Sequence, residues 1–399
     1  MIAVATMEGG TAAAAATYST EYPPAVWIPA SKANYTVANR PVDYPVDFII
    51  IHDTEGTYAS AIAAFQDPDR AASANYVVGS KGQIAQMVLE TNIAWHAGNW
   101  DYNTRAIGIE HEGYAYVNGS FTTPEYQASE HLIASICSRW GVPINRTHVI
   151  GHYQVPDPNN PGLFGGSDHH TDPGPYWHWD NYIKFAAEFA NALPSPPHMV
   201  LTAVAISHDS SVSLSWSAAR TCHLPVASYD ILRQPGNVDK TVSGSATSAL
   251  ITGLQNGTKY TFTVTAHNAD GQSSLISNPV IPMTVPAPPT GVVATAAGGA
   301  AVVSWTAPTD DGGSKITGYV VTTYLSGSAP SQVTFMQVNN LEIVFNLIDG
   351  QAYTFTVSAI NAVGPGPPSA SSSAVTPSAS LRPLPPAQAP AASPPAPRA

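Results

Sequence analysis

The sequence has few charged residues, few basic residues and no long apolar run, and each scarcity narrows the class of protein. Charged side chains make up 11% of its 399 residues, against 44% for apolar ones. Lysine and arginine number 15 against 27 acidic residues, for a net charge of −12. This argues against a nucleic-acid binder, because phosphate binding requires clustered basic side chains. Since no apolar run reaches about 18 residues, we expect no membrane span.

Cysteine is also scarce, with only Cys137 and Cys222. Cys137 lies in a predicted helix over 122–142, which begins with a threonine cap and an early proline and ends at a glycine. Its place on the apolar face of this helix makes it a core residue. Cys222 lies in a different predicted domain. We therefore expect two unlinked thiols, and so few cysteines leave the cellular compartment open.

Composition divides the chain into several parts, and its length allows two or three domains. Residues 1–22 are rich in small side chains and lack a basic stretch, so we expect a flexible leader and a poor signal peptide. Residues 23–194 hold most of the histidines and end in a proline-containing linker, NALPSPPH (191–198). Residues 378–399 are rich in proline and alanine, which predicts an extended, disordered tail.

Two copies of one repeat lie between the linker and the tail. Trp216 of the first copy corresponds to Trp305 of the second, and Tyr260 corresponds to Tyr353. Each copy consists of short segments with alternating apolar residues, separated by Gly, Asn and Pro turns. This pattern predicts two small antiparallel β-sandwiches.

Each copy contains the run L-x-x-G-x-x-Y-x-F-x-V-x-A-x-N after an early tryptophan. In these features the segments 196–285 and 286–377 resemble fibronectin type III domains. The resemblance implies that the tyrosine of this run packs at a sheet corner and that its hydroxyl bonds to the backbone. A second interpretation, in which these domains contact a polysaccharide through their aromatic residues, stays open.

Three segments of the histidine-rich part carry potential metal ligands. The apolar strand in VDFIIIHDTEG (46–56) runs into His52, a second short apolar strand ends at His152, and Asp172 is followed by Pro-Gly-Pro. Two imidazoles and one carboxylate, with water in the fourth place, make a plausible catalytic zinc site. Taken alone, the pattern also fits ordinary hydrogen-bonded histidines.

Six short motifs follow one another between residues 48 and 175. They are FIIIHDTEG (48–56), SANYVVGSKGQIAQMV (73–88), AWHAG (94–98), AIGIEHEG (106–113), VIGH (149–152) and TDPGP (171–175). Residues 46–182 therefore resemble the zinc amidases that include phage-type amidases, anhydro-muropeptide amidases and peptidoglycan-recognition proteins. The resemblance implies an α/β domain with a central mixed sheet flanked by helices.

The resemblance also assigns roles at matching positions. It implies that His52, His152 and Asp172 bind Zn²⁺, and that Glu110 is the general base. His170 lies where many members carry a lysine that stabilises the developing oxyanion. This is a departure, because a histidine changes charge near neutral pH whereas a lysine stays charged.

Other residues of these motifs have less specific roles. The resemblance places His96 of AWHAG in the substrate groove, so we expect it to contact substrate. Asn75 replaces a histidine common in the family. His111 faces away from Glu110 on the predicted strand and is expected to be structural. His169 is an alternative to His170 for the polar role.

The resemblance implies an enzyme outside the cell or in the cell wall that cuts the amide between N-acetylmuramic acid and L-alanine of peptidoglycan. Two alternatives come from other classes: a non-catalytic peptidoglycan-binding or sensing protein, and an adhesin-like wall binder that acts through the two sandwiches. All three matched ligand positions hold residues that can bind metal, which favours the enzyme.

Overall fold

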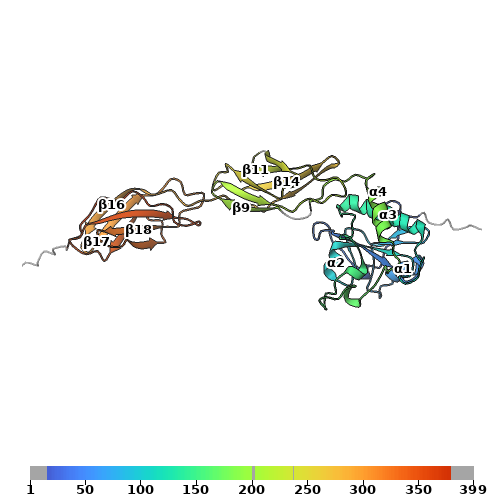
Figure 1. Ribbon diagram of the computed structural model, residues 1–399. Helices are drawn as coiled ribbons and strands as arrows, with labels where there is room; N and C mark the ends of the chain where they lie inside the picture. Colours follow the sequence, from blue (N-terminus) through green and yellow to red (C-terminus); the bar gives the residue numbers. More distant parts are fainter. Residues whose placement is uncertain (1–15, 200–202, 237, 379–399) are drawn as a thin grey trace, which may run out of the picture. The chain divides into compact units, whose positions relative to one another are not determined.

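The computed structural model describes residues 16–199, 203–236 and 238–378 (Figure 1). Its N-terminal part is a mixed α/β domain, as expected, built on a six-stranded sheet in the order β1-β5-β4-β7-β3-β8. The strands are β1 (Val26–Trp27), β3 (Phe48–Asp53), β4 (Tyr76–Val78), β5 (Ile84–Gln86), β7 (Ala106–His111) and β8 (Val149–Gly151). Strand β3 is parallel to both of its neighbours, and β4 pairs with β5 in the antiparallel sense.

Both faces of this sheet are covered. The helices are α1 (Tyr58–Gln66), α2 (Trp100–Arg105), α3 (Thr123–Trp140) and α4 (Trp179–Ala190), with 3-10 turns η1 (Lys32–Asn34), η2 (His152–Gln154) and η3 (Gly166–Asp168) and a small ribbon of β2 (Tyr35–Thr36) and β6 (Ile93–Ala94). Ile49 and Ile51 pack in the core with α3 and α4, whereas Ile50 packs in a separate core on the other face. This alternation follows the period of a strand and holds β3 between two apolar layers.

The helix predicted over 122–142 is confirmed as α3. Thr122 accepts a hydrogen bond from the backbone of Glu125, whose side chain accepts one from the Thr122 backbone in return. Gly141 ends the helix at φ 65°, a left-handed conformation that glycine adopts without strain. Among the described residues, no helix is long and apolar enough to cross a membrane.

The two repeats fold as β-sandwiches. The first has the sheets β13-β10-β9 and β12-β11-β14-β15, and the second has β16-β17-β20 and β19-β18-β21. The strands are β9 (Val204–His208), β10 (Ser211–Ser215), β11 (Ser228–Gln234), β12 (Val238–Ser243), β13 (Ser248–Thr252), β14 (Thr261–Asn268), β15 (Gly271–Ile276), β16 (Thr290–Ala297), β17 (Ala300–Thr306), β18 (Gly318–Leu325), β19 (Ser331–Phe335), β20 (Leu341–Phe345) and β21 (Tyr353–Ile360).

The aromatic residues shared by the repeats are structural. Trp216 and Trp305 are buried. The Tyr260 hydroxyl accepts a hydrogen bond from the backbone of Gln255, five residues earlier, and Tyr353 repeats this contact with Ile348. The expected corner role of both tyrosines is therefore confirmed.

The prediction of a flexible leader over residues 1–22 is wrong for the last residues of this range. Tyr18 forms a β-bridge with Val26, and Ser19 and Tyr22 are buried against the N-terminal domain. The small residues there suggested disorder, but the aromatic ring of Tyr22 packs on Tyr76 of the sheet. The rest of the leader, residues 1–15, and the predicted tail from 379 lie outside the described residues.

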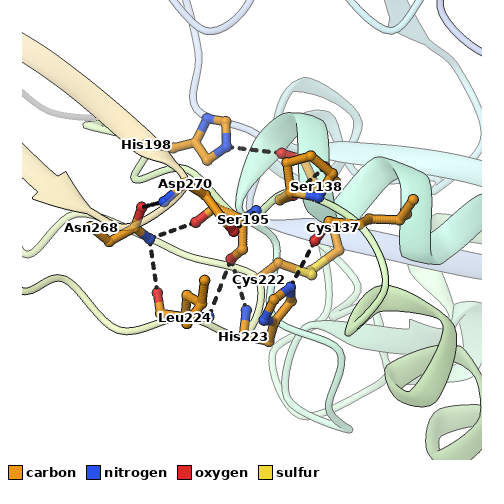
Figure 2. Close-up of a disulfide and its surroundings, with 11 residues drawn as sticks. Cys137, Ser138, Ser195, His198, Cys222, His223, Leu224, Asn268 and Asp270 are labelled. Atoms are coloured by element: carbon orange, nitrogen blue, oxygen red, sulfur yellow. Dashed lines mark hydrogen bonds between the residues drawn. A yellow bond between two sulfur atoms is a disulfide. The ribbon is translucent and has the colours of Figure 1, made fainter.

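The expectation of two unlinked thiols is also wrong, because Cys137 forms a disulfide with Cys222 (Figure 2). The two cysteines are far apart in sequence and belong to different folds. The linker nevertheless returns along the end of α3, where His198 forms a β-bridge with Arg220. This bridge brings Cys222, two residues later, to the buried Cys137.

Candidate metal centre and active site

The parallel strands place three functional side chains at one edge of the sheet. His52 lies in β3 directly opposite Glu110 of β7, and His152 follows the last residue of β8. Because the carboxyl ends of parallel strands meet at the same edge, these side chains converge although they are far apart in sequence. Asp172 lies in the loop that follows, and its backbone carbonyl accepts a hydrogen bond from the Tyr153 backbone N–H at 3.3 Å.

His52, His152 and Asp172 form a compact buried cluster. One ligand atom from each lies within 4.8 Å of the others. The Nδ1 atom of His52 is 3.1 Å from one carboxylate oxygen of Asp172, and Nδ1 of His152 is 3.2 Å from the other. Both imidazoles therefore turn Nδ1 toward the carboxylate, and the three residues predicted as ligands are brought together.

The electrostatics of this cluster suit a cation. Burial lowers the pKa of His52 to about 4, so its imidazole is neutral at neutral pH. Burial would raise the pKa of Asp172, but hydrogen bonds from His152 and His52 outweigh it and hold the pKa below its usual range. Neutral imidazoles and an ionised carboxylate are the protonation states that bind a metal.

Glu110 lines the cleft beside these residues. Its Oε2 atom is buried and has no hydrogen-bond partner among the described residues. Burial raises the pKa of Glu110 well above its usual value, and the negative charges of Asp172 and Asp53 raise it further. A divalent cation at the three ligands would oppose this shift. The unpartnered oxygen and the excess of negative charge both fit a metal beside Glu110.

The two adjacent histidines of the third motif lie in different places. His170 lines the cleft, is 53% exposed, and stacks on His152 with 4.7 Å between ring centroids. His169 has a left-handed backbone and points its Nε2 to Asp157 at 2.7 Å. Between the two candidates for the polar role, the structure places His170 at the cleft.

His96 lines the cleft and also contacts a candidate ligand directly. Its Nδ1 is 3.0 Å from Nε2 of His52, and the two rings meet edge to face. Because the neutral His52 ring donates from Nδ1 to Asp172, its Nε2 accepts the hydrogen bond from Nδ1 of His96. The sequence predicted a substrate contact for His96 but gave no sign of this bond, which joins two separate motifs.

Behind β3 a chain of hydrogen bonds reaches the backbone of the same ligand. Burial lowers the pKa of His111 to about 3, so its ring is neutral and carries one proton. His111 Nδ1 donates this proton to the His52 carbonyl at 2.9 Å, which leaves Nε2 as the acceptor. The Ser129 hydroxyl therefore donates to His111 at 2.7 Å and accepts from the Tyr182 hydroxyl at 2.6 Å. The structural role expected for His111 is confirmed.

The cleft over these residues has a volume of about 870 Å³ and is open to solvent. Two of its lining residues, Arg70 and Trp100, were not singled out from the sequence, although they lie close to the SANYVV and AWHAG motifs. The charge of Arg70 favours the ionised form of Glu110. The indole of Trp100 is half exposed at the cleft. A cleft of this size, lined by both polar and aromatic groups, falls within the usual range of ligand-binding pockets.

Comparison with known proteins identifies two family profiles. One, described as N-acetylmuramoyl-L-alanine amidase, matches residues 42–175. The other, the fibronectin type III domain, matches residues 195–282 and 287–375. The first match contains all three candidate ligands and Glu110, and the second covers both sandwiches.

Three curated proteins illustrate the similarity. N-acetylmuramoyl-L-alanine amidase A of Achromobacter lyticus is 39% identical over 168 residues, which is 40% of this chain and 92% of the relative. The 1,6-anhydro-N-acetylmuramyl-L-alanine amidase AmpD of Haemophilus influenzae is 28% identical over 28% of this chain and 57% of the relative. Chitinase A1 of Niallia circulans is 35% identical over 39% of this chain, but the match spans only 22% of that protein.

Proposed function

Because the chain belongs to the N-acetylmuramoyl-L-alanine amidase family, we propose that it hydrolyses the amide between N-acetylmuramic acid and L-alanine in peptidoglycan. The observation that carries the proposal is the buried cluster of His52, His152 and Asp172 at the base of an open cleft. A binding protein would need the cleft but not a set of three metal ligands with an unpartnered carboxylate beside it.

We propose that His52 and His152 hold Zn²⁺ through their Nδ1 atoms and that Asp172 supplies a carboxylate oxygen. Zinc, when bound, polarises the amide carbonyl and lowers the pKa of water toward ~7. Glu110 accepts the proton of the attacking water and passes it to the leaving amine of L-alanine. His170, exposed at the cleft, donates a hydrogen bond to the developing oxyanion.

The protein is proposed to act outside the cell or in the cell wall. The Cys137–Cys222 disulfide supports this location, because disulfides persist in oxidising compartments. Contact between the two fibronectin type III domains and wall glycan is a further proposal. The buried positions of Trp216 and Trp305 give it no support, so such contact would have to use other side chains.

The experiment measures zinc content and the release of L-alanyl amino groups from purified peptidoglycan. We expect His52→Ala to lose metal and activity together. Glu110→Gln should keep its zinc and lose turnover by roughly 10²–10⁴-fold, the usual contribution of a general base. Bound zinc with no amino-group release by the unaltered protein would leave the non-catalytic binding protein as the better interpretation.

A further inference from the structure

The first sandwich contacts the catalytic domain through a set of polar and covalent bonds around the end of α3. Cys222 is bonded to Cys137 of α3, and His198 Nε2 donates to the Ser138 carbonyl at 3.1 Å (Figure 2). The Ser138 hydroxyl in turn donates to the carbonyl of Pro194. The final carbonyls of a helix lack partners within it, so His198 satisfies one of these groups from the linker side.

The linker itself is fixed to the sandwich. Ser195 is fully buried, and its backbone N–H donates to Asp270 at 2.7 Å. Its hydroxyl accepts from the backbone N–H of His223 at 3.0 Å, and its carbonyl accepts from the Asn268 side chain at 2.6 Å (Figure 2). A segment with this many bonded and buried groups is part of a packed interface.

Close approach at this interface depends on Gly141. A Cβ atom built there would lie 2.8 Å from the His198 ring and 3.1 Å from Cβ of Arg220. Both distances are shorter than normal van der Waals contacts. The helix terminus and the first residues of the sandwich therefore pack with no room for a side chain between them.

The same interface reaches the strand that carries His52. Arg220 of the sandwich forms an ion pair with Asp47 and donates to the Val46 carbonyl at 2.8 Å. Asp47 is buried, immediately precedes β3, and is also bound by Arg105 Nε at 2.6 Å. Without Arg220 this buried carboxylate would keep only one of its two cationic partners, and a buried charge that lacks compensation is costly.

We infer that the first fibronectin type III domain is an integral part of the catalytic unit: Cys222 fastens it to α3, and Arg220 is a positioning residue that holds the base of β3. The domain thus stabilises the fold around the candidate metal ligands, whereas a spacer domain would be joined only by a flexible linker. Arg220 touches neither the ligands nor the cleft, so its effect reaches His52 along the strand.

The test uses the full chain and hydrogen–deuterium exchange read by mass spectrometry. The variants are Cys137→Ala/Cys222→Ala, Arg220→Met and Arg220→Lys, and the control is Lys259→Met, which removes an exposed cation of the same domain. We expect the double variant and Arg220→Met to exchange at least several-fold faster over residues 46–53 and 193–198. Strand β21 should not change, Arg220→Lys should restore much of the protection, and Lys259→Met should match the unaltered chain.

Two further readouts keep the inference falsifiable if a variant folds poorly. The unaltered chain is kept under oxidising conditions and then denatured. Thiol titration of this sample should find no free thiol. The Tm of the double variant should fall by roughly 4–15 °C, as expected for the loss of a disulfide in a domain of this size. Two free thiols in the unaltered chain, together with an unchanged Tm for the double variant, would overturn the role of the disulfide. Unchanged exchange over residues 46–53 in folded Arg220→Met would overturn the role of Arg220.

Discussion

His52 and His96 lie with Nε2 of the first 3.0 Å from Nδ1 of the second, so a candidate ligand is oriented by a residue of another motif. A histidine that binds metal through one ring nitrogen is commonly fixed by a hydrogen bond at the other. His96 is also buried, and burial lowers its pKa well below the usual range, so its ring is neutral and would accept from Nε2 of His52 if Nδ1 of His52 bound a metal. The pair therefore links the AWHAG motif to the candidate metal centre as well as to the cleft.

The first prediction separates the two roles of His96. If His96 mainly orients His52, His96→Ala should weaken zinc affinity by roughly 10–100-fold, the usual effect of losing such a partner. Chelator competition measures this affinity, and steady-state kinetics give KM and kcat. His169→Ala, which removes an imidazole outside the cleft, is the control. A raised KM with unaltered zinc affinity would instead support the substrate contact that the sequence suggested.

The second prediction concerns His170. Its exposed ring at the cleft is placed to donate a hydrogen bond to the developing oxyanion. We expect His170→Ala to lower kcat by roughly 10²–10³-fold, the usual cost of one oxyanion donor, whereas His170→Lys keeps a donor and should retain most of the activity. Steady-state rates on peptidoglycan provide the measurement. Equal kcat values for the unaltered chain and His170→Ala would remove His170 from the mechanism.

The third prediction follows from the direction of the bonds behind β3. Ser129→Ala leaves His111 Nε2 without a donor and the Tyr182 hydroxyl without an acceptor, both in the core. Each such group costs about 1–3 kcal/mol. Tyr182→Phe removes only one donor, and Ser129 can still donate to His111, so the expected loss is about 0.5–1.5 kcal/mol. Urea unfolding measures the loss in the free energy of unfolding for each variant, which should be larger for Ser129→Ala. A larger loss for Tyr182→Phe would contradict the assigned direction of the hydrogen bonds.

The sequence predicted the cluster of candidate ligands better than its surroundings. His52 lies near the end of one short apolar strand and His152 follows another, and parallel strands bring such ends together, so the cluster could be anticipated from order and pattern. The bond between His52 and His96 could not, because it depends on the distance between two motifs in space. The Cys137–Cys222 disulfide was missed for a related reason: the domain boundary was predicted, but the return of the linker along α3 was not.

The fourth prediction uses a buried carboxyl group on α3. Glu130 is almost inaccessible to solvent, and burial raises its pKa to about 7. The unfolded chain releases this proton near pH 4.5, so between that pH and about 7 the folded state binds more protons. The free energy of unfolding contributed by Glu130 therefore falls as the pH rises through this window.

Glu130→Gln removes the ionisation but keeps the shape of the side chain. We expect this variant to raise the Tm at pH 8, where the folded chain otherwise carries a buried charge, and to change it little at pH 5. Glu188→Gln, at an exposed position on α4, is the matched control and should have a small effect at both values. Thermal unfolding at the two pH values decides the matter. An equal shift at pH 5 and pH 8 would show that packing, and not the charge of Glu130, limits stability there.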